Sequence, residues 1–383
     1  MYRYFYTVVL GILLGSCSSH TTAIRALKPA TITLPDHIQS IGTIDRSMPE
    51  KGFSGILEGA LTGEQIGQDK RGRQAAIEGF AKTLTQTPRF SIRPIATELT
   101  GSKDGSTMSR PLAWTEIDKL CKMYQVDAIA ALELFDSDQF FSKSSKNESY
   151  KDKEGKEHSR LRYYIDRKME VRTGFRVYDN VNKDIIDEFV TSGQNSDSGN
   201  GLTETDAQNN LRNVYDQVRE VGTTSGRIYA QRIAPLYETI HRSFIKKVPT
   251  NKDAHEKALN AAKAKDWTKA AEIWNTMASQ STDVKTKGIA AYNMAIVCEA
   301  QGKIDLAIDW AKKSYYEHGY KKASRYLVQL KDRKYDLERL EIQMKSRNNT
   351  KQIKAKNRNI FCVIPLIRPD HEIFTKTDFH YKH

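Results

Sequence analysis

Beyond its first twenty positions, the chain of 383 residues lacks any apolar run long enough to span a bilayer, which takes about 20 residues. Its mean hydropathy is −0.61, yet apolar residues are frequent enough to build ordinary cores. We therefore expect the body of the chain to fold outside the bilayer and not to be globally disordered. The length is typical of two or three domains.

Cysteine is scarce, with four residues in the whole chain. When Cys17 is set aside, the remaining Cys121, Cys298 and Cys362 are odd in number and show no spacing typical of a disulfide framework or a zinc site. Cys121 and Cys298 lie among apolar residues with helical spacing. We expect both to be small buried apolar side chains.

Catalytic signatures are also absent. The nine histidines include no pair with the spacing of HExxH. The chain has no GxSxG elbow and no glycine-rich phosphate-binding pattern. We therefore expect a protein that is not an enzyme and holds no cofactor or metal, although missing motifs do not exclude an unfamiliar enzyme.

The N-terminus does contain a lipoprotein signal. Arg3 gives a short positive region, and Val8–Leu14 is an apolar stretch too short to span the bilayer as a mature helix. The residues from Leu14 to Cys17 resemble a lipobox, in which small residues precede the cysteine that takes the lipid. We predict a signal peptide over 1–16 and lipidation of Cys17. The alternative is a plain secretory signal with a chance cysteine.

The three residues after Cys17 are Ser18, Ser19 and His20, none of them acidic. By resemblance to known sorting rules, an Asp there would favour the inner membrane and an acidic run would favour the cell surface. We therefore expect an outer-membrane lipoprotein that faces the periplasm and is held to the membrane by its lipid anchor.

The formal net charge is +13, and a basic balance can indicate nucleic acid or anionic lipid as a partner. Much of the excess lies near the C-terminus, where Lys351, Lys354, Lys356, Arg358 and Arg368 stand among few acids. The charge is thus largely a property of the tail, and an exported protein meets little nucleic acid. We expect no nucleic-acid partner.

After an anchor and linker over 17–37, the segment 38–248 has the strand–helix alternation of an α/β domain. Hydrophobic periodicity predicts helices over 53–61, 73–84 and 114–124, and strands over 38–44, 90–92 and 126–135. The last of these strands is almost continuously apolar, which is typical of a central strand covered on both faces.

Polar and charged residues at 142–160 predict a loop or mobile insertion. A β-hairpin follows, with its turn at 179–183, so we expect a mixed sheet. A capping box of Thr203 and Asp206 then begins one long helix. Its predicted buried stripe consists of Leu211, Val214, Val218, Val221 and Ile228.

Residues 251–345 form an all-helical region with two similar repeats. In each repeat, two small residues lie about twelve positions apart: Ala258 with Ala270, and Ala295 with Ala307. This pattern resembles a tetratricopeptide repeat, in which small residues let paired helices approach closely. The alternative is an unrelated pair of αα-hairpins. The region is followed by a basic tail over 346–383 that we expect to be disordered.

Four stretches carry a family resemblance: PEKGFSGILEGALTGEQIGQDKRG, VDAIAALELFDSD, RTGFRVYDNVNKDIIDEF and YAQRIAPLY. The chain resembles uncharacterised Bacteroidota lipoproteins in which a domain of unknown function precedes tetratricopeptide repeats. The tail does not match this pattern. The resemblance implies no activity, because none is assigned to that family. The order of elements is also loosely similar to the periplasmic domain of the curli secretion lipoprotein and the N-terminal domain of TolB, a likeness that does not give function.

Two groups of residues are candidate sites. Three carboxylates follow the apolar strand, where α/β sheets often place a site for a metal or for acid–base chemistry: Glu133, Asp136 and Asp138. A glycine-rich segment could bring backbone amides close to a ligand: its polar residues are Glu64, Gln65, Gln68, Asp69 and Lys70. The structural alternatives are a solvated strand end and a turn that fixes its neighbours.

Two classes of function therefore compete. The first is a non-catalytic envelope scaffold or assembly factor whose helical repeats bind another protein. The second is a periplasmic small-ligand-binding protein or unfamiliar enzyme, with its site at the sheet edge. The sequence favours the first, because it has repeat-like helices and no catalytic motif.

Overall fold

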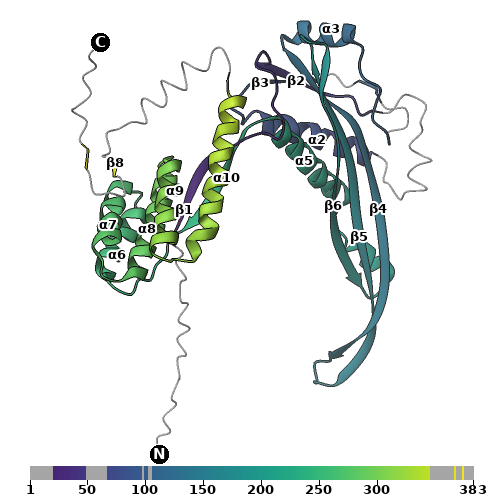
Figure 1. The fold of residues 1–383 in the computed structure, drawn as a ribbon. Helices are drawn as coiled ribbons and strands as arrows, with labels where there is room; N and C mark the ends of the chain where they lie inside the picture. The colour runs from purple at the N-terminus through teal and green to yellow at the C-terminus, as the bar shows by residue number, and fades with distance from the viewer. Residues whose placement is uncertain are drawn as a thin grey trace, which may run out of the picture. The chain divides into compact units, whose positions relative to one another are not determined.

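The computed structural model describes residues 20–48, 67–96, 99–101, 106–345, 366–367 and 373–374 (Figure 1). The chain divides into two compact units. The sheet unit comprises residues 27–237 and 338–355, and the helical unit comprises residues 1–26, 238–337 and 356–383. The signal peptide, Cys17, the predicted helix at 53–61, Glu64 and Gln65 lie outside the described residues.

A five-stranded mixed sheet, in the order β3-β2-β4-β5-β6, confirms the predicted fold of the N-terminal region. Its strands are β2 (Ser40–Asp45), β3 (Ser91–Pro94), β4 (Ala128–Lys151), β5 (Glu157–Asp179) and β6 (Asp184–Gly201). β2 runs parallel to β3 and β4, whereas β4, β5 and β6 are antiparallel. The pairing of β2 with β4 ends at Asp45 opposite Leu132, so the parallel part of the sheet is short.

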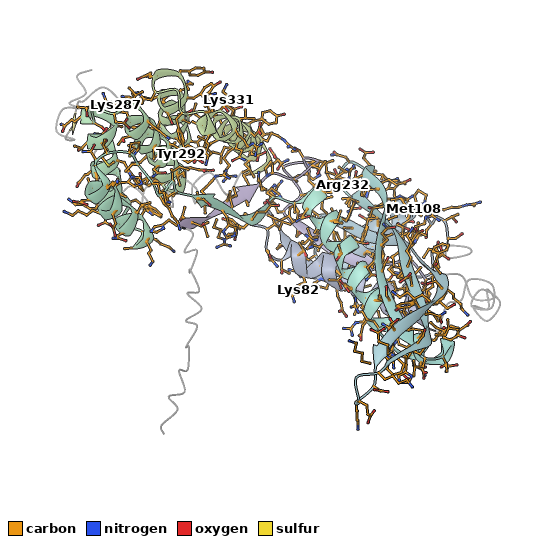
Figure 2. All side chains as sticks on the ribbon, turned by 90° about the horizontal axis from the view of Figure 1, so that it is seen from below. Lys82, Met108, Arg232, Lys287, Tyr292 and Lys331 are labelled. Atoms are coloured by element: carbon orange, nitrogen blue, oxygen red, sulfur yellow. The ribbon has the colours of Figure 1, made fainter. Side chains whose placement is uncertain are left out.

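Helices cover both faces of the buried half of this sheet. They are α2 (Gln68–Leu84), α3 (Trp114–Tyr124) and α5 (Val214–Ile233), whereas the short α4 (Glu204–Asn209) packs on the end of β6. α2 and α5 lie side by side over Ala128 and Leu132 (Figures 1 and 2), while α3 packs over Ile129 and Ala131 on the opposite face. This double cover explains the continuous apolar sequence of β4, and α3 has the bounds that its periodicity predicts.

Glycines bring the backbones of α2 and α5 into direct contact. A Cβ added at Gly226 would lie 2.0 Å from the carbonyl oxygen of Ala76, and one at Gly222 would lie 2.6 Å from that of Gly72. Side chains larger than hydrogen would therefore push the two helices apart. The pair forms the layer that closes the main core of the sheet unit, around Phe80, Phe175 and other apolar side chains.

The prediction of a loop at 142–160 is wrong. β4 continues to Lys151, β5 begins at Glu157, and the two pair continuously, so only residues 152–156 form the turn. Figure 1 shows the resulting ribbon of β4, β5 and β6 extending beyond the helices. Its distal residues are largely exposed on both faces. Side chains in this part of β4 and β5 therefore need not alternate between apolar and polar. The hydrophobic pattern of the sequence does not reveal these strands for that reason.

The prediction of one long helix from Thr203 is also wrong. The capping box of Thr203 and Asp206 is present, but the helix that it begins is the short α4. α5 starts separately, with Asn213 as its N-cap. Ile228, assigned to the buried stripe, is exposed. The carbonyl of Ala207 lies against Gly199, which shows that α4 packs on the end of β6 instead of extending α5.

Most of the helical unit is built from consecutive helices that pack on one another: α6 (Lys252–Lys263), α7 (Trp267–Gln280), α8 (Val284–Ala300), α9 (Ile304–Lys312), a π-helix (Lys313–Glu317) and α10 (Lys322–Gln343). The residues of α10 from Glu338 onward belong to the sheet unit. Two further strands, β1 (Thr21–Lys28) and β7 (Leu236–Ser243), pair with each other.

The four small residues predicted at helix crossings, Ala258, Ala270, Ala295 and Ala307, are all fully buried. They belong to one core with Trp274 and the surrounding apolar side chains. Small residues at these positions allow the close helix pairing that the sequence predicts. The helical character of this region is confirmed, and its assignment as a tetratricopeptide repeat stays a prediction.

In the tail, the described residues are two short strands, β8 (Leu366–Ile367) and β9 (Ile373–Phe374), which pair antiparallel. The rest of 346–383 lies outside the described residues, and its disorder stays a prediction. Within the part of the chain that the structure describes, no helix is long and apolar enough to cross a membrane.

Candidate functional site

The three predicted carboxylates do not mark the end of their strand, because β4 continues well beyond them. They lie just past the point where β2 ends. The β4–β5 pairing shifts between Leu132 and Leu134, which leaves Glu133 as the extra residue of a β-bulge. Bulges re-aim side chains, and here the carboxylate of Glu133 is fully buried.

Both oxygens of Glu133 are engaged. Its Oε2 accepts a hydrogen bond from Arg46 Nη1 at 2.6 Å, and its Oε1 accepts one from the Tyr178 hydroxyl at 2.5 Å. Arg176 Nη1 lies 3.4 Å from the same Oε1. One buried carboxylate thus sits between two guanidinium groups, which balance its charge and fix its orientation.

Backbone carbonyls of the segment before α3 complete this cluster. Arg176 Nη1 donates to the carbonyl of Ser109 at 3.0 Å, and Arg46 Nη1 donates to that of Arg110 at 2.6 Å. Arg176 Nε also donates to Glu188 Oε2 at 2.8 Å. The guanidinium groups therefore join β2, β5, β6 and the segment before α3 around Glu133.

Burial raises the pKa of Glu133, and the charges of Arg46 and Arg176 together with the Tyr178 hydroxyl oppose this rise. Burial and the neighbouring Glu133 carboxylate raise the pKa of Tyr178 to about 12. Tyr178 therefore stays protonated and donates to Glu133 at physiological pH. Both carboxylate oxygens of Glu133 therefore have partners within the fold.

Asp136 and Asp138 are separate from this cluster. Asp136 lies 3.6 Å from Arg172 Nη1 in an ion pair with a half-exposed arginine. Asp138 is opposite Glu170 in the pairing of β4 with β5 and is partly exposed. The structure therefore does not bring the three carboxylates together into one site.

The described part of the glycine-rich segment is tied to β4. Gln68 Nε2 donates to Ser137 Oγ at 2.8 Å, and Gln139 Nε2 donates to Gln68 Oε1 at 2.9 Å. The Ser137 hydroxyl in turn donates to Asp69. Lys70 is exposed. These bonds attach the first turn of α2 to the sheet. For Gln68 and Asp69, this agrees with the alternative that the segment fixes its neighbours and binds no ligand.

Sequence reasoning missed Arg46, Arg176 and Tyr178, which complete the Glu133 cluster. Two signals were present. Arg46 directly follows β2, at the same sheet end as Glu133. Arg176 and Tyr178 alternate with apolar residues in β5, so they share a face of the strand. Only the bulge, which has no sequence signature here, shows that Glu133 meets them.

In the helical unit, the end of β7 and the chain that follows it lie along α8 and are held there by specific side chains. Arg242 donates from Nε and Nη2 to the two carboxylate oxygens of Glu299, at 2.7 and 2.9 Å. The Tyr326 hydroxyl donates to Glu299 Oε2 at 2.7 Å. This bidentate pair is strong in energy and specific in geometry.

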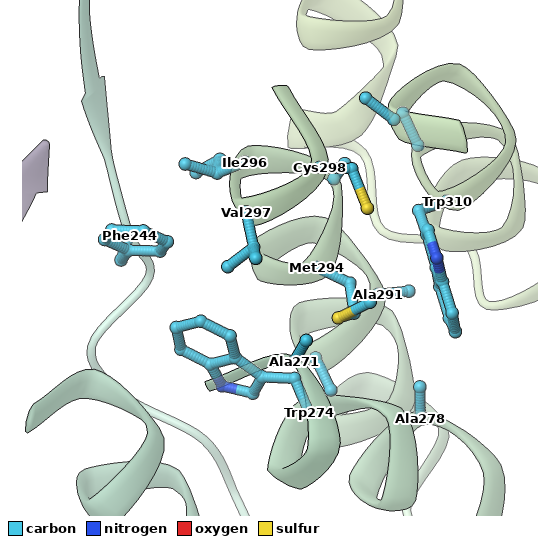
Figure 3. Close-up of a cluster of buried hydrophobic side chains, with 14 of the residues drawn as sticks. Phe244, Ala271, Trp274, Ala278, Ala291, Met294, Ile296, Val297, Cys298 and Trp310 are labelled. Atoms are coloured by element: carbon cyan, nitrogen blue, oxygen red, sulfur yellow. The ribbon is translucent and has the colours of Figure 1, made fainter. Parts of the chain in front are cut away.

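Asn293 binds both backbone groups of Ile245, which lies three residues after Arg242. Its Oδ1 accepts from the Ile245 amide at 2.9 Å, and its Nδ2 donates to the Ile245 carbonyl at 3.1 Å. His255 Nε2 also contacts that carbonyl, at 2.8 Å. The neighbouring Phe244 stacks on Trp274 with ring centroids 5.2 Å apart, in a core that includes residues of α8 (Figure 3).

α8, the first helix of the second predicted repeat, is buried along nearly its whole length. Residues 242–250 of the same chain cover part of its surface.

Large apolar side chains are exposed on the outside of the helical unit. Val284, at the start of α8, is 56% exposed, and Tyr316, in the π-helix, is 68% exposed. On α10, Val328 and Tyr335 are similarly exposed and lie seven residues apart, which places them on one face of the helix. Large apolar side chains on α8, the π-helix and α10 are thus left in water.

Both described cysteines are buried, as predicted. Burial raises the pKa of the Cys121 and Cys298 thiols to about 12. Each stays protonated and packs as a small apolar side chain. Among the residues that the structure describes, no cluster of three or more His, Cys, Asp or Glu side chains could hold a metal ion.

The protein thus combines a mixed sheet, which continues as a long antiparallel ribbon, with a helical unit. The chain belongs to the family described as a domain of unknown function (DUF8603), which matches residues 38–244, more than half of its length. A second domain of unknown function, DUF6340, matches residues 256–335. Both matches agree with the expectation that the chain belongs to an uncharacterised family.

None of the curated proteins matches the chain. Among solved structures, the dodecamer of a point variant of PelC from Paraburkholderia phytofirmans is similar at 10% identity with a TM-score of 0.21, covering 56% of this chain and 99% of that one. Another PelC dodecamer from the same organism is similar at 9% identity with a TM-score of 0.21, covering 56% and 98%.

Proposed function

We propose that this protein is a lipid-anchored, non-catalytic scaffold or assembly factor of the cell envelope, facing the periplasm, that binds another protein through its helical unit. The observation that carries the proposal is the exposure of Val284 and Tyr316 on a unit whose inner helix is already covered. Large apolar side chains left in water on a packed helical unit favour burial against a partner.

The competing function, a ligand-binding protein or enzyme with its site at the sheet edge, has weaker support. Its best candidate, Glu133, has both oxygens bound by Arg46 and Tyr178. A group that served as acid, base or metal ligand would need a free oxygen or an approach for substrate. The geometry favours the scaffold.

A pull-down from native membranes tests the protein-binding claim. The double variant Val284→Ser/Tyr316→Ser removes the exposed apolar side chains, and Met123→Ser/Val181→Ser is a matched control because those residues of the sheet unit are 61% and 64% exposed. We expect the first variant, and not the control, to lose a specific protein identified by mass spectrometry. The same proteins on both variants and on the parent would contradict the proposal.

The anchor is tested separately. Cys17→Ala removes the thiol that takes the lipid, so the variant should leave the detergent phase in a phase-partition assay. Unchanged partitioning with membranes would show that lipid on Cys17 does not hold the protein there. The helical unit could still bind a partner in that case, so the two parts of the proposal fail independently.

A further inference from the structure

A strongly basic surface lies at one end of the helical unit. It is formed by the first turn of α8 and by the π-helix and the start of α10. Residues 283–287 and 313–325 carry six lysines and arginines against two acids. We call this surface the basic patch: Lys285, Lys287, Lys313, Lys321, Lys322 and Arg325. Figure 2 marks Lys287 on the helical unit.

The two segments of the patch are adjacent in space. The Ser314 hydroxyl donates to the carbonyl of Gly288 at 2.6 Å. A Cβ at Gly288 would lie 2.9 Å from Tyr320 and 3.2 Å from His318, so the turn before α10 packs directly on α8. Burial lowers the pKa of His318, the charge of Glu317 opposes this, and Lys313 and Lys287 lower it further, which places all three charged groups near the same ring.

The two acids of these segments are Asp283 and the exposed Glu317, against six cations. Asp283 is the N-cap of α8 and accepts the Thr286 amide at 2.6 Å. Within the described part of the chain, Lys285, Lys321 and Lys322 have no carboxylate at ion-pair distance, and all three are exposed. The charge of these three lysines is therefore available to a partner.

Apolar side chains lie within the same two segments. Val284 precedes Lys285, and Tyr316 follows Lys313 of the π-helix by three residues. Cations around an exposed aromatic match a partner that presents carboxylates around an apolar residue. The lysines are spread over several turns, and Asp283 already caps the α8 N-terminus, so the patch lacks the convergent donors that would select a single phosphate.

We propose that the basic patch binds an acidic polypeptide segment, in which Asp or Glu residues flank an apolar or aromatic side chain. This inference rests on the proposed function, because it names the chemistry of the partner that the helical unit takes. The lysines supply attraction and steering over a distance of about 8 Å at physiological salt, and Tyr316 and Val284 supply the apolar contact.

The test is fluorescence anisotropy with the full chain carrying Cys17→Ala. The probe is a labelled decapeptide of glutamates with a central phenylalanine. Lys321→Glu/Lys322→Glu should weaken binding at least tenfold. The matched reversal Lys257→Glu/Lys263→Glu, at exposed positions of α6, should change binding less than twofold. Added salt should weaken binding to the parent chain.

Three results would overturn the inference: no binding of the peptide, equal weakening by both reversals, or a patch that binds phosphatidylglycerol vesicles or duplex DNA through Lys321 and Lys322 in place of the peptide. If the peptide fails while the Val284→Ser/Tyr316→Ser variant still loses a protein in the pull-down, the partner is not acidic. If both fail, the proposed function itself is wrong.

Discussion

Asn293 binds Ile245 through both of that residue's backbone polar groups, accepting from its amide at 2.9 Å and donating to its carbonyl at 3.1 Å. Asn293 thereby satisfies both backbone polar groups of Ile245 and holds this part of the chain against α8. This contact contributes to the burial of most of α8.

Replacing Asn293 with Leu should destabilise the helical unit by about 1–3 kcal/mol, because the Ile245 amide would be left without its acceptor in a buried place. Guanidinium-induced unfolding followed by tryptophan fluorescence measures this, in a Trp114→Phe background so that the remaining tryptophans all report on the helical unit. Asn260→Ala, at an exposed position of α6, is the control and should stay within about 0.5 kcal/mol. Equal midpoints for the two variants would show that the bidentate contact is not important.

The helical unit should become less stable in mild acid through His255. Trp274 Nε1 donates to its Nδ1 at 3.2 Å, so Nε2 carries the proton that bonds the Ile245 carbonyl. Burial lowers the pKa of His255 below its usual 6.5. The folded state therefore favours the neutral ring. The stability that this provides is complete above pH 6.5 and is lost as the pH falls below 6.5 toward the lowered pKa.

Chemical unfolding at several pH values between about 5 and 8 checks this sign. His255→Gln should flatten the loss of stability in acid, whereas His241→Gln, at an exposed position, should leave it unchanged. The pKa of His318 is also lowered. Part of the dependence of the unfolding free energy on pH therefore remains in both variants. A profile for His255→Gln identical to that of the parent would contradict the role of His255.

The Glu133 cluster should matter for stability. Glu133→Gln leaves Arg46 buried without its carboxylate and Arg176 with Glu188 alone, and removing one partner of a buried ion pair costs about 3–5 kcal/mol. Asp138→Asn, on the same strand but partly exposed, should cost less than about 0.5 kcal/mol. Thermal unfolding of the two variants compares them. A stable Glu133→Gln protein would reopen the question of a chemical role for this carboxylate.

The contact of α2 with α5 gives a prediction with a clear sign. Gly→Ala in a helix normally stabilises by about 1 kcal/mol. At Gly226, however, the new Cβ would lie 2.0 Å from the carbonyl oxygen of Ala76, so Gly226→Ala should destabilise by about 1–3 kcal/mol. Thr224→Ala, exposed on the same helix, should be neutral or slightly stabilising. An increase in melting temperature for Gly226→Ala would show that the helices do not touch there.

The sequence predicts those elements whose burial creates a hydrophobic period. The amphipathic α3 has the predicted bounds Trp114–Tyr124, and the double-covered start of β4 is recognisable from its apolar run. The four alanines of the helix crossings are also identifiable, because close packing requires small side chains at fixed spacing. In each case, a pattern within one short stretch of sequence indicates which residues are buried.

The failures have a common physical cause. Residues 142–160 are largely in strands held by backbone pairing, with side chains in water on both faces, so no hydrophobic period marks them. The Glu133 cluster joins residues from β4, β5 and the end of β2 through a bulge. The cover of α8 by residues 242–250 likewise depends on tertiary contacts. A single sequence contains no signal for such encounters.

The central claim is that the outer face of the helical unit contacts another protein. A photoreactive phenylalanine analogue placed at Tyr316 in intact cells tests this most directly, with the same analogue at the similarly exposed Val181 as the control. The account predicts a discrete crosslinked species from position 316 that is weakened by Lys321→Glu/Lys322→Glu and absent from position 181. The absence of a species from position 316, or the same species from both positions, would contradict it.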